Sequence, residues 1–194
     1  MKLFVAATLA ASATAFAPVA FTGRQSTAID AGIGATLMSL QGPEIFWGAE
    51  GVAVGKEESD IKGYDNFTKL VAACQANGIN LDSGEYTLLA PSDSAFEKHA
   101  SEVGTPITAD ILQYHVIPGR KSMDALTTDQ PTLQGGTLTA YRKFRKNWLD
   151  FAIIGLKSEG ASMSANWPAD VVCDNGYIHA IDTVLVPGAY TGSR

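Results

Sequence analysis

The chain has 194 residues, of which 18% are charged and 46% hydrophobic, a composition typical of a globular protein and not of a disordered one. Its formal net charge of −6 gives no general attraction for nucleic acids or anionic membranes, and so argues against proteins that act through either. Two cysteines, Cys74 and Cys173, are too few for a disulfide framework; they either pair with each other or, as we expect, remain buried free thiols.

Residues 1–15 have the pattern of a secretory signal peptide. Lys2 precedes a short apolar stretch rich in alanine, and small residues at Ala13 and Ala15 form a cleavage site. The competing interpretation is a membrane anchor, against which Pro18 and the few leucine and isoleucine residues weigh. We therefore expect cleavage after Ala15 and no transmembrane helix in the mature chain.

Residues 16–38 have the composition of a transit peptide, with several serines and threonines, one arginine and only one acid, Asp30. Phe16 stands directly after the expected cut. This junction resembles the bipartite plastid-targeting signals of algae with secondary plastids, such as diatoms, and the resemblance implies import into a plastid. Plain secretion is the alternative.

Residues 39–60 are predicted to form an extended linker between the targeting segment and the folded domain. The linker is rich in glycine, yet it contains Ile45, Phe46 and Trp47. Such bulky apolar residues either fold back on the domain or insert into a partner, as aromatic anchors at protein interfaces do. We favour the partner and take Phe46 and Trp47 as candidate binding residues.

A single domain is predicted over residues 61–188. Its first helix lies within residues 64–78, where apolar positions have helical spacing and Asp65 or Asn66 can cap the start. Asn66 also opens an Asn-x-Thr glycosylation triplet. Because a capping side chain makes a poor glycan acceptor, we favour the structural role.

The next segment combines a strand, a turn and a helix. Residues 85–90 are predicted to form a strand that stops at Pro91, and a helix begins at Ala95. Ser92 or Asp93 is placed to cap that helix, because a short side-chain oxygen satisfies its first amide donors. The polar residues of this turn are therefore predicted to fasten a strand to a helix.

The rest of the domain contains one more helix, capped by Thr108, and then mainly strands. Residues 131–141 are predicted to be two strands joined by a Gly-Gly turn, and 150–156 a buried strand. Residues 169–187 are predicted to be two strands joined by Asp174-Asn175-Gly176. Helices in the first half and strands in the second predict an α+β fold with a small β core.

Three segments together resemble the fasciclin domain family. They are YTLLAPSDSAF at 86–96, ILQYHVIPGR at 111–120 and NGYIHAIDTVLVP at 175–187, with PTLQG at 131–135 as a weaker fourth. The resemblance covers about residues 60–188 and implies a single domain, a β-sandwich or wedge flanked by helices. It also implies a role in adhesion or protein–protein contact and not in catalysis.

The resemblance also identifies residues that hold the fold. Tyr114 and His115 match the family's Tyr-His motif, and Asn175, Gly176 and His179 lie in the third segment. We take all five as structural residues.

No catalytic, metal or cofactor site is expected. The histidines lack the spacing of metal ligands, and no Cys-x-x-Cys motif occurs. Cys173, His179 and Asp182 can be drawn as a hydrolytic triad, and Ser94 with His99 as a dyad. Neither group has a nucleophile elbow or a phosphate-binding loop around it. We therefore expect a protein that is not an enzyme.

One basic stretch, residues 141–151, reverses the sign of the otherwise acidic chain. Aromatic residues alternate there with four cations, Arg142, Lys143, Arg145 and Lys146. This pattern suits an acidic protein partner or anionic lipid headgroups, and a solvated edge strand is an equal alternative. Nucleic acid is not expected, because the stretch is short. We take the four cations and Trp148 as candidate partner-binding residues.

Two functional hypotheses follow from these patterns. The first is a non-enzymatic interaction protein of a secondary plastid, an accessory or stabilising subunit of a thylakoid photosystem–antenna complex on either side of the membrane. The second is a secreted cell-surface adhesion protein. Residues 189–194 are expected to form a C-terminal tail in both cases.

Overall fold

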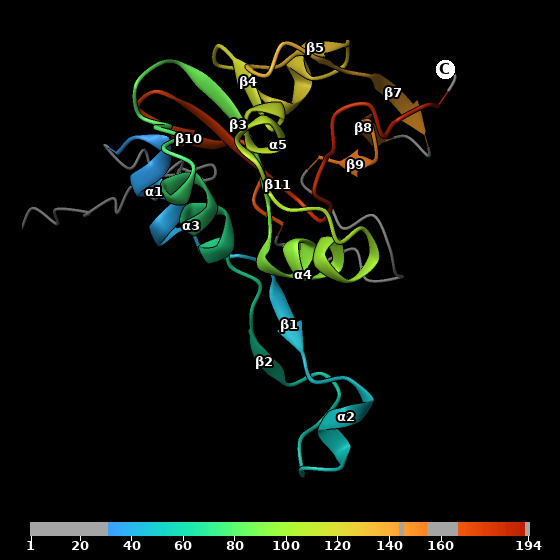
Figure 1. The fold of residues 1–194 in the computed structure, drawn as a ribbon. Helices are drawn as coiled ribbons and strands as arrows, with labels where there is room; N and C mark the ends of the chain where they lie inside the picture. Colours follow the sequence, from blue (N-terminus) through green and yellow to red (C-terminus); the bar gives the residue numbers. More distant parts are fainter. Residues whose placement is uncertain (1–30, 144–145, 155–166, 193–194) are drawn as a thin grey trace, which may run out of the picture.

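The computed structural model describes residues 31–143, 146–154 and 167–192. Its centre is a sheet of four strands, β3 (Tyr86–Pro91), β4 (Val116–Pro118), β10 (Val171–Cys173) and β11 (Gly176–Ile181). Their order in the sheet is β10-β11-β3-β4 (Figure 1). β11 runs parallel to β3, whereas both outer pairs are antiparallel.

Both faces of this sheet are buried, because successive residues of a strand point to opposite sides. On one face Leu88 and Ala90 pack in a core cluster with residues of four helices, and on the other Leu89 packs with Leu138 and Leu149 from later hairpins. The helices are α1 (Ile33–Ser39), α3 (Thr68–Ala76), α4 (Asp93–Glu102) and α5 (Ala109–Tyr114). Burial on both sides explains why β3 is mostly apolar and does not alternate with polar residues.

Between β4 and β10 the described chain contains shorter strands and one turn of 3₁₀ helix, η1 (Met123–Ala125). The strands are β5 (Gln130–Pro131), β6 (Thr137–Leu138), β7 (Ala140–Lys143), β8 (Lys146–Leu149) and β9 (Ala152–Ile153). β5 pairs with β6, and β7, β8 and β9 form a three-stranded sheet. The predicted α+β fold, with helices around a β core, is confirmed.

Residues 44–64, called the arm below, project from the rest of the molecule (Figure 1). β1 (Glu44–Phe46) and β2 (Ile61–Tyr64) pair antiparallel, and α2 (Ala49–Val52) lies between them in the chain. We predicted an extended linker over 39–60. A hairpin forms instead, because the backbone amides of Trp47 and Gly48 donate to the carbonyls of Asp60 and Glu58 on the returning segment.

Helix α1 belongs to the folded core, although we assigned residues 16–38 to a targeting segment. Ile33 and Leu37 are only 0% and 2% exposed, and the amide of Ile33 donates to Asn175 Oδ1 at 2.8 Å. A cut after residue 38 would remove both apolar side chains from the core. Among the described residues, the packed core therefore includes α1 and does not begin at residue 61.

The polar residues between β3 and α4 join two helices by exchanging caps. Asp93 does not cap α4 as predicted; its carboxylate accepts hydrogen bonds from Lys69 N at 2.7 Å and Thr68 Oγ1 at 2.6 Å, at the start of α3. Asp65, which precedes α3, accepts from Ser94 N at 2.9 Å and from the Ser94 hydroxyl, at the start of α4. Each carboxylate thus faces the positive end of the other helix and satisfies its amide donors.

The alternative cap candidates make other contacts. Asn66 Oδ1 accepts from Gly42 N at 3.2 Å, and the Ser92 side chain makes no capping bond to α4. Asn66 therefore holds the base of the arm against the start of α3 and has the structural role that we favoured over glycosylation.

Replacing Asp65 or Asp93 by alanine should lower the free energy of unfolding by about 1–2 kcal/mol each, because helix amides then lose their acceptor. Asp124→Ala is the matched control: this carboxylate is exposed, and its loss should change stability by less than about 0.5 kcal/mol. Urea denaturation measures all three variants. Equal stabilities for the three would contradict the exchange of caps.

Candidate functional site

His115 is a buried link between α5 and the C-terminal segment. Its Nδ1–H donates to the carbonyl of Ile111 at 2.8 Å, and its Nε2 accepts from Leu185 N at 2.9 Å. The ring is 1% exposed, and burial lowers the pKa of His115 to about 4. Both ring nitrogens are therefore occupied in one neutral tautomer, which leaves neither for a substrate or a metal.

The other two histidines are also bonded internally. His179 Nδ1 accepts from Asp170 N at 3.1 Å, its Nε2–H donates to the carbonyl of Lys121 at 2.9 Å, and burial lowers its pKa. His99 Nε2 lies 3.0 Å from Thr105 Oγ1. Across the described ranges, no group of three histidine, cysteine or acidic residues is placed to hold a metal ion.

The hydrolytic groups that can be drawn from the sequence do not assemble. The Ser94 hydroxyl donates to Asp65, not to His99. His179 cannot act as a base toward Cys173, because both of its nitrogens are engaged. Cys173 and Cys74 are free and buried, as expected, and burial raises the pKa of Cys74 to about 11. A thiol that stays protonated at neutral pH is a poor nucleophile.

Tyr114 fixes α5 to the hairpins of the second half. Its hydroxyl lies 2.8 Å from Asp150 Oδ2 and 3.1 Å from the carbonyl of Thr137. Asp150 is buried with a positive φ of 49°, and its second oxygen accepts from Thr139 N at 2.7 Å. Burial, together with the Asp150 carboxylate, raises the pKa of Tyr114, so the phenol stays protonated.

Asn175 and Gly176 form a junction between segments that are far apart in the chain. Asn175 Nδ2 donates to the carbonyls of Leu81 at 2.7 Å and Gly84 at 2.8 Å, while its Oδ1 accepts from Ile33 N. A Cβ at Gly176 would lie 1.7 Å from the carbonyl oxygen of Tyr86, so only glycine fits. From these contacts we infer a structural role for all five motif residues.

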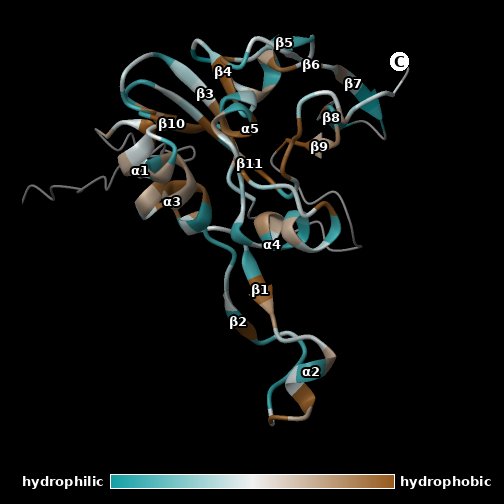
Figure 2. Ribbon diagram, viewed as in Figure 1, coloured by the Kyte–Doolittle hydropathy of each residue, from teal (hydrophilic) through white to brown (hydrophobic). Residues whose placement is uncertain are grey.

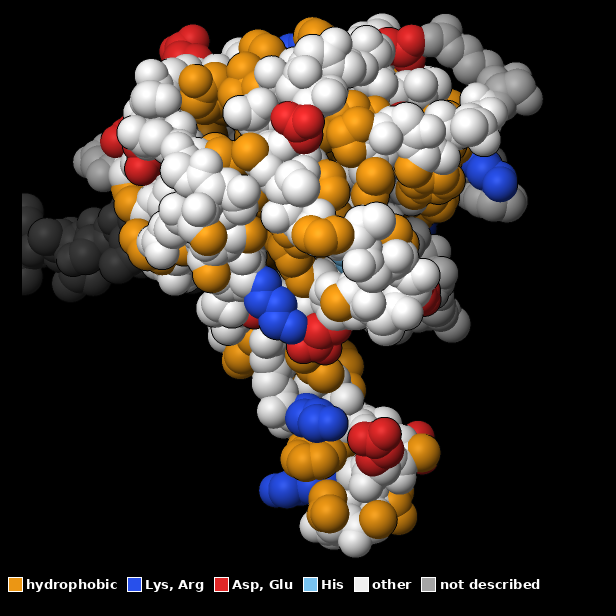
Figure 3. Space-filling view, viewed as in Figure 1, with side chains coloured by type: hydrophobic (Ala, Val, Ile, Leu, Met, Phe, Trp, Pro, Cys, Tyr) orange, Lys and Arg blue, Asp and Glu red, His pale blue; other side chains and the backbone are white. Residues whose placement is uncertain are grey.

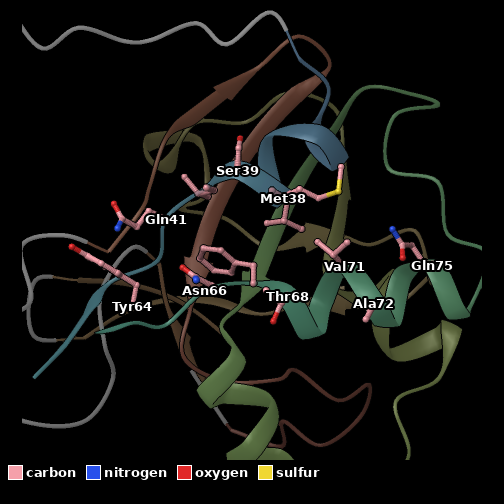
Figure 4. Close-up of a pocket in the computed structure, with 12 residues that line it drawn as sticks. Met38, Ser39, Gln41, Tyr64, Asn66, Thr68, Val71, Ala72 and Gln75 are labelled. Atoms are coloured by element: carbon pink, nitrogen blue, oxygen red, sulfur yellow. The ribbon is translucent and has the colours of Figure 1, made fainter. Parts of the chain in front are cut away.

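A groove of about 570 Å³ runs along α3 beside the end of α1 (Figure 4). Leu37, Phe67 and Val71 supply apolar lining, and Met38, which is 66% exposed, lies above them. Amide side chains such as Gln41 complete the lining, and none of the described lining residues is charged. This chemistry suits an apolar or peptide-like ligand and not acid–base catalysis.

The arm, which adjoins the groove, also exposes apolar side chains to solvent. Ten large hydrophobic side chains are exposed among the described residues, and six of them belong to the arm. These six are Ile45, Phe46, Val52, Val54, Ile61 and Tyr64. Figures 2 and 3 show apolar residues along the strands and tip of the arm. Tyr64 also lines the groove, so the arm and the groove are contiguous.

The two predicted anchors of the arm differ in exposure. Phe46 is 43% exposed and open to contact. Trp47 is half-buried, with Lys62 Nζ 4.9 Å from its ring centroid, and Lys62 Nζ also lies 3.6 Å from Glu50 Oε2. Trp47 therefore stabilises the arm from within, and Phe46 is the stronger contact candidate.

Strands β7 and β8 form the basic hairpin, residues 140–149. Arg142 and Lys143 are exposed and Lys146 is half-buried, whereas Arg145 lies outside the described residues. Trp148 stacks on Tyr141 with 5.8 Å between ring centroids. Trp148 is half-buried and packs against Tyr141, and its role as a partner-binding residue stays a prediction.

The predicted C-terminal tail is packed against this hairpin. Tyr190 stacks on Tyr141 at 5.8 Å and meets Phe151 edge-on at 5.0 Å. Tyr141 and Phe151 thus hold Tyr190, and the exposed Arg142 and Lys143 remain candidate contact groups.

The pKa of His115 predicts a loss of stability in acid. Its folded-state pKa of about 4 lies below the ordinary value of 6.5, so the unfolded chain takes up the proton first as the pH falls. The free energy of unfolding should therefore be unaffected by His115 above pH 6.5 and fall by about 3 kcal/mol between pH 6.5 and 4. The lowered pKa of His179 adds to the loss in the same direction.

Proton NMR of the folded protein isolates this effect from the titration of carboxylates. The His115 ring signals should stay at their neutral-form position as the pH is lowered through 6.5. A folded-state titration near the ordinary value would show that the ring is not held neutral by its two bonds.

Comparison with known proteins connects these features to a family. The Fasciclin domain model matches residues 64–187. Transforming growth factor-beta-induced protein ig-h3 of Sus scrofa is 34% identical over 136 residues, which cover 63% of this chain but only 18% of that protein. Immunogenic protein MPB70 of Mycobacterium bovis is 28% identical over an alignment 204 positions long, which covers 96% of this chain and 94% of that protein. Cell surface glycolipoprotein MPB83 of Mycobacterium bovis is 32% identical over 120 residues, or 56% and 47%.

Residues 1–30 lie outside the described residues, so the signal peptide and most of the transit-like segment stay predictions. Within the part of the chain that the structure describes, no helix is both long and apolar enough to cross a bilayer.

The family model covers most of the chain, and it includes the segments that contain Tyr114, His115, Asn175, Gly176 and His179. The resemblance seen in the sequence is confirmed: this chain belongs to the fasciclin domain family.

Proposed function

We propose that this chain is a non-enzymatic docking protein that acts outside the cell or on its surface and binds a protein partner through the arm and the adjoining groove. The observation that carries the proposal is the distribution of exposed apolar side chains, most of which lie on the arm. Clustered exposed apolar residues mark interaction sites, whereas scattered ones need no explanation.

The polar groups of the domain support a role without catalysis. His115 and His179 use both ring nitrogens in internal hydrogen bonds, and the two thiols are buried. These two imidazoles and two thiols are thus used to hold the fold. The surface left for function is apolar and amide-lined, and such a surface recognises partners by shape and burial.

The location outside the cytosol is supported by two observations. Residues 1–15 have the pattern of a signal peptide, and one relative is described as a cell surface glycolipoprotein. That description belongs to the relative, and for this chain the location is part of the proposal.

A second candidate is an accessory subunit of a thylakoid photosystem–antenna complex in a secondary plastid. It is favoured by Phe16 after the expected cut and by the acid-poor sequence that follows. Because α1 is packed in the core, a plastid transit segment would have to end before about residue 31 and not at residue 38.

N-terminal sequencing of the mature protein, together with a C-terminal fluorescent fusion, separates these candidates. Secretion predicts a mature start at Phe16 and fluorescence at the cell surface. The plastid alternative predicts a start near residue 31 and fluorescence in the plastid. A mature start beyond residue 39 would contradict the packing of α1 in the core.

The docking role is tested by making the arm polar. Phe46→Ser combined with Ile61→Ser should abolish binding of protein-coated beads to cells of the source organism, because it removes two exposed apolar contacts and leaves the core unchanged. Leu133→Ser is the matched control, since Leu133 is 41% exposed but lies outside the arm. Bead binding that survives in the arm variant, with the fold intact by circular dichroism, would overturn the proposal.

A further inference from the structure

The arm and the basic hairpin have opposite charge. The arm contains five acidic residues and two lysines, a net charge of −3, and Glu57 and Glu58 are exposed beside its turn. The described part of the basic hairpin contributes Arg142, Lys143 and Lys146. Figure 1 shows the arm and the basic hairpin in different parts of the molecule, well separated from each other. The two therefore cannot meet within one copy.

The basic hairpin also borders an apolar hollow. A pocket of about 400 Å³ is lined by Met123, Ile153 and Ile154, with Arg142 and Lys146 in the same lining. One acid, Asp124, lines it as well, so the cations outnumber the acids there. The site thus offers an apolar surface next to positive charge.

The arm has the matching pattern. Val52 and Val54 are 62% and 61% exposed, and Glu57 and Glu58 follow them within a few residues. Apolar side chains next to carboxylates on the arm complement the apolar hollow next to cations at the hairpin. The net negative charge also disfavours an anionic membrane as the arm's target.

We propose that the arm of one copy docks on the basic hairpin of a second copy of this chain. This inference rests on the proposed docking role of the arm and names its partner. Two different surfaces meet in such a contact, so it is heterologous and repeats from head to tail along a series of copies. The series as a whole keeps one free arm at one end and one free hairpin at the other, which suits a protein that links surfaces.

A charge-swap experiment tests the contact. Sedimentation velocity of the full chain at rising concentration should show reversible association that weakens as salt is added. Glu57→Lys with Glu58→Lys should weaken association about tenfold or more, and so should Arg142→Glu with Lys143→Glu, because each pairs like charges. Glu102→Lys, on an exposed position of α4, is the control and should associate like the unchanged chain.

The decisive measurement is an equimolar mixture of the two double variants. A reversed arm then meets a reversed hairpin, and an unchanged arm meets an unchanged hairpin, so association should return. Aggregation caused by the N-terminal residues 1–30 of the full chain would, in contrast, be unchanged by these charge reversals.

Three results would overturn the inference: an unchanged chain that stays monomeric, double variants that associate normally, or a mixture no stronger than either variant. If bead binding still depends on Phe46 and Ile61 in that case, the docking role stands and only the identity of the partner falls.

Discussion

The fold depends on the close approach of β11 to β3 at Gly176. These strands are distant in sequence and pair in parallel. A side chain at position 176 would clash with the carbonyl oxygen of Tyr86, so the position requires glycine. The neighbouring Asn175 amide ties the same point to α1 and to the loop before β3. Arg120 Nη2 donates to the carbonyl of Cys173 at 3.1 Å and so also holds the β10–β11 hairpin. A single turn thereby fixes three distant parts of the chain.

Polar groups are found paired in the interior of the domain, whereas apolar groups are found exposed on the arm. Buried polar groups such as His115 and Asp65 are matched by hydrogen bonds, as a stable interior requires. Outside, the arm presents apolar side chains without such cover. A two-stranded ribbon is only marginally stable alone in water. A partner that covers the arm would therefore increase the stability of the arm. This contrast is the physical basis for proposing that the arm and its adjoining groove bind a partner.

The sequence predicts the local elements well and the long-range contacts poorly. The hairpin at Asp174-Asn175-Gly176 and the Thr108 cap are short-range patterns, and both are found as expected. The parallel pairing of β3 with β11 was not predicted, because pairing across a long separation leaves no local pattern. The exchange of caps between Asp65 and Asp93 was missed for the same reason. Each aspartate is suited to cap a helix, but the sequence does not show which of the two helices it caps.

The candidate site shows the same division. Aromatic residues in a glycine-rich segment drew attention to the region of the arm, and their role in binding stays a proposal. The hairpin form of the arm was not predicted, because it depends on backbone hydrogen bonds across the turn. The stacking of Trp148 on Tyr141 depends on the pairing of β7 with β8, and the sequence alone did not predict it. The burial of α1 was also missed, since small and hydroxyl residues such as Gly34 and Thr36 match a targeting peptide as well as a packed helix.

Hydroxyl-radical footprinting in the native setting and on the dilute purified protein tests most directly whether the arm is covered when the protein works. The account predicts that Phe46, Val52 and Ile61 are strongly oxidised in dilute solution and protected in the native setting, while Leu133 reacts equally in both. Equal oxidation of the arm in the two settings would contradict it.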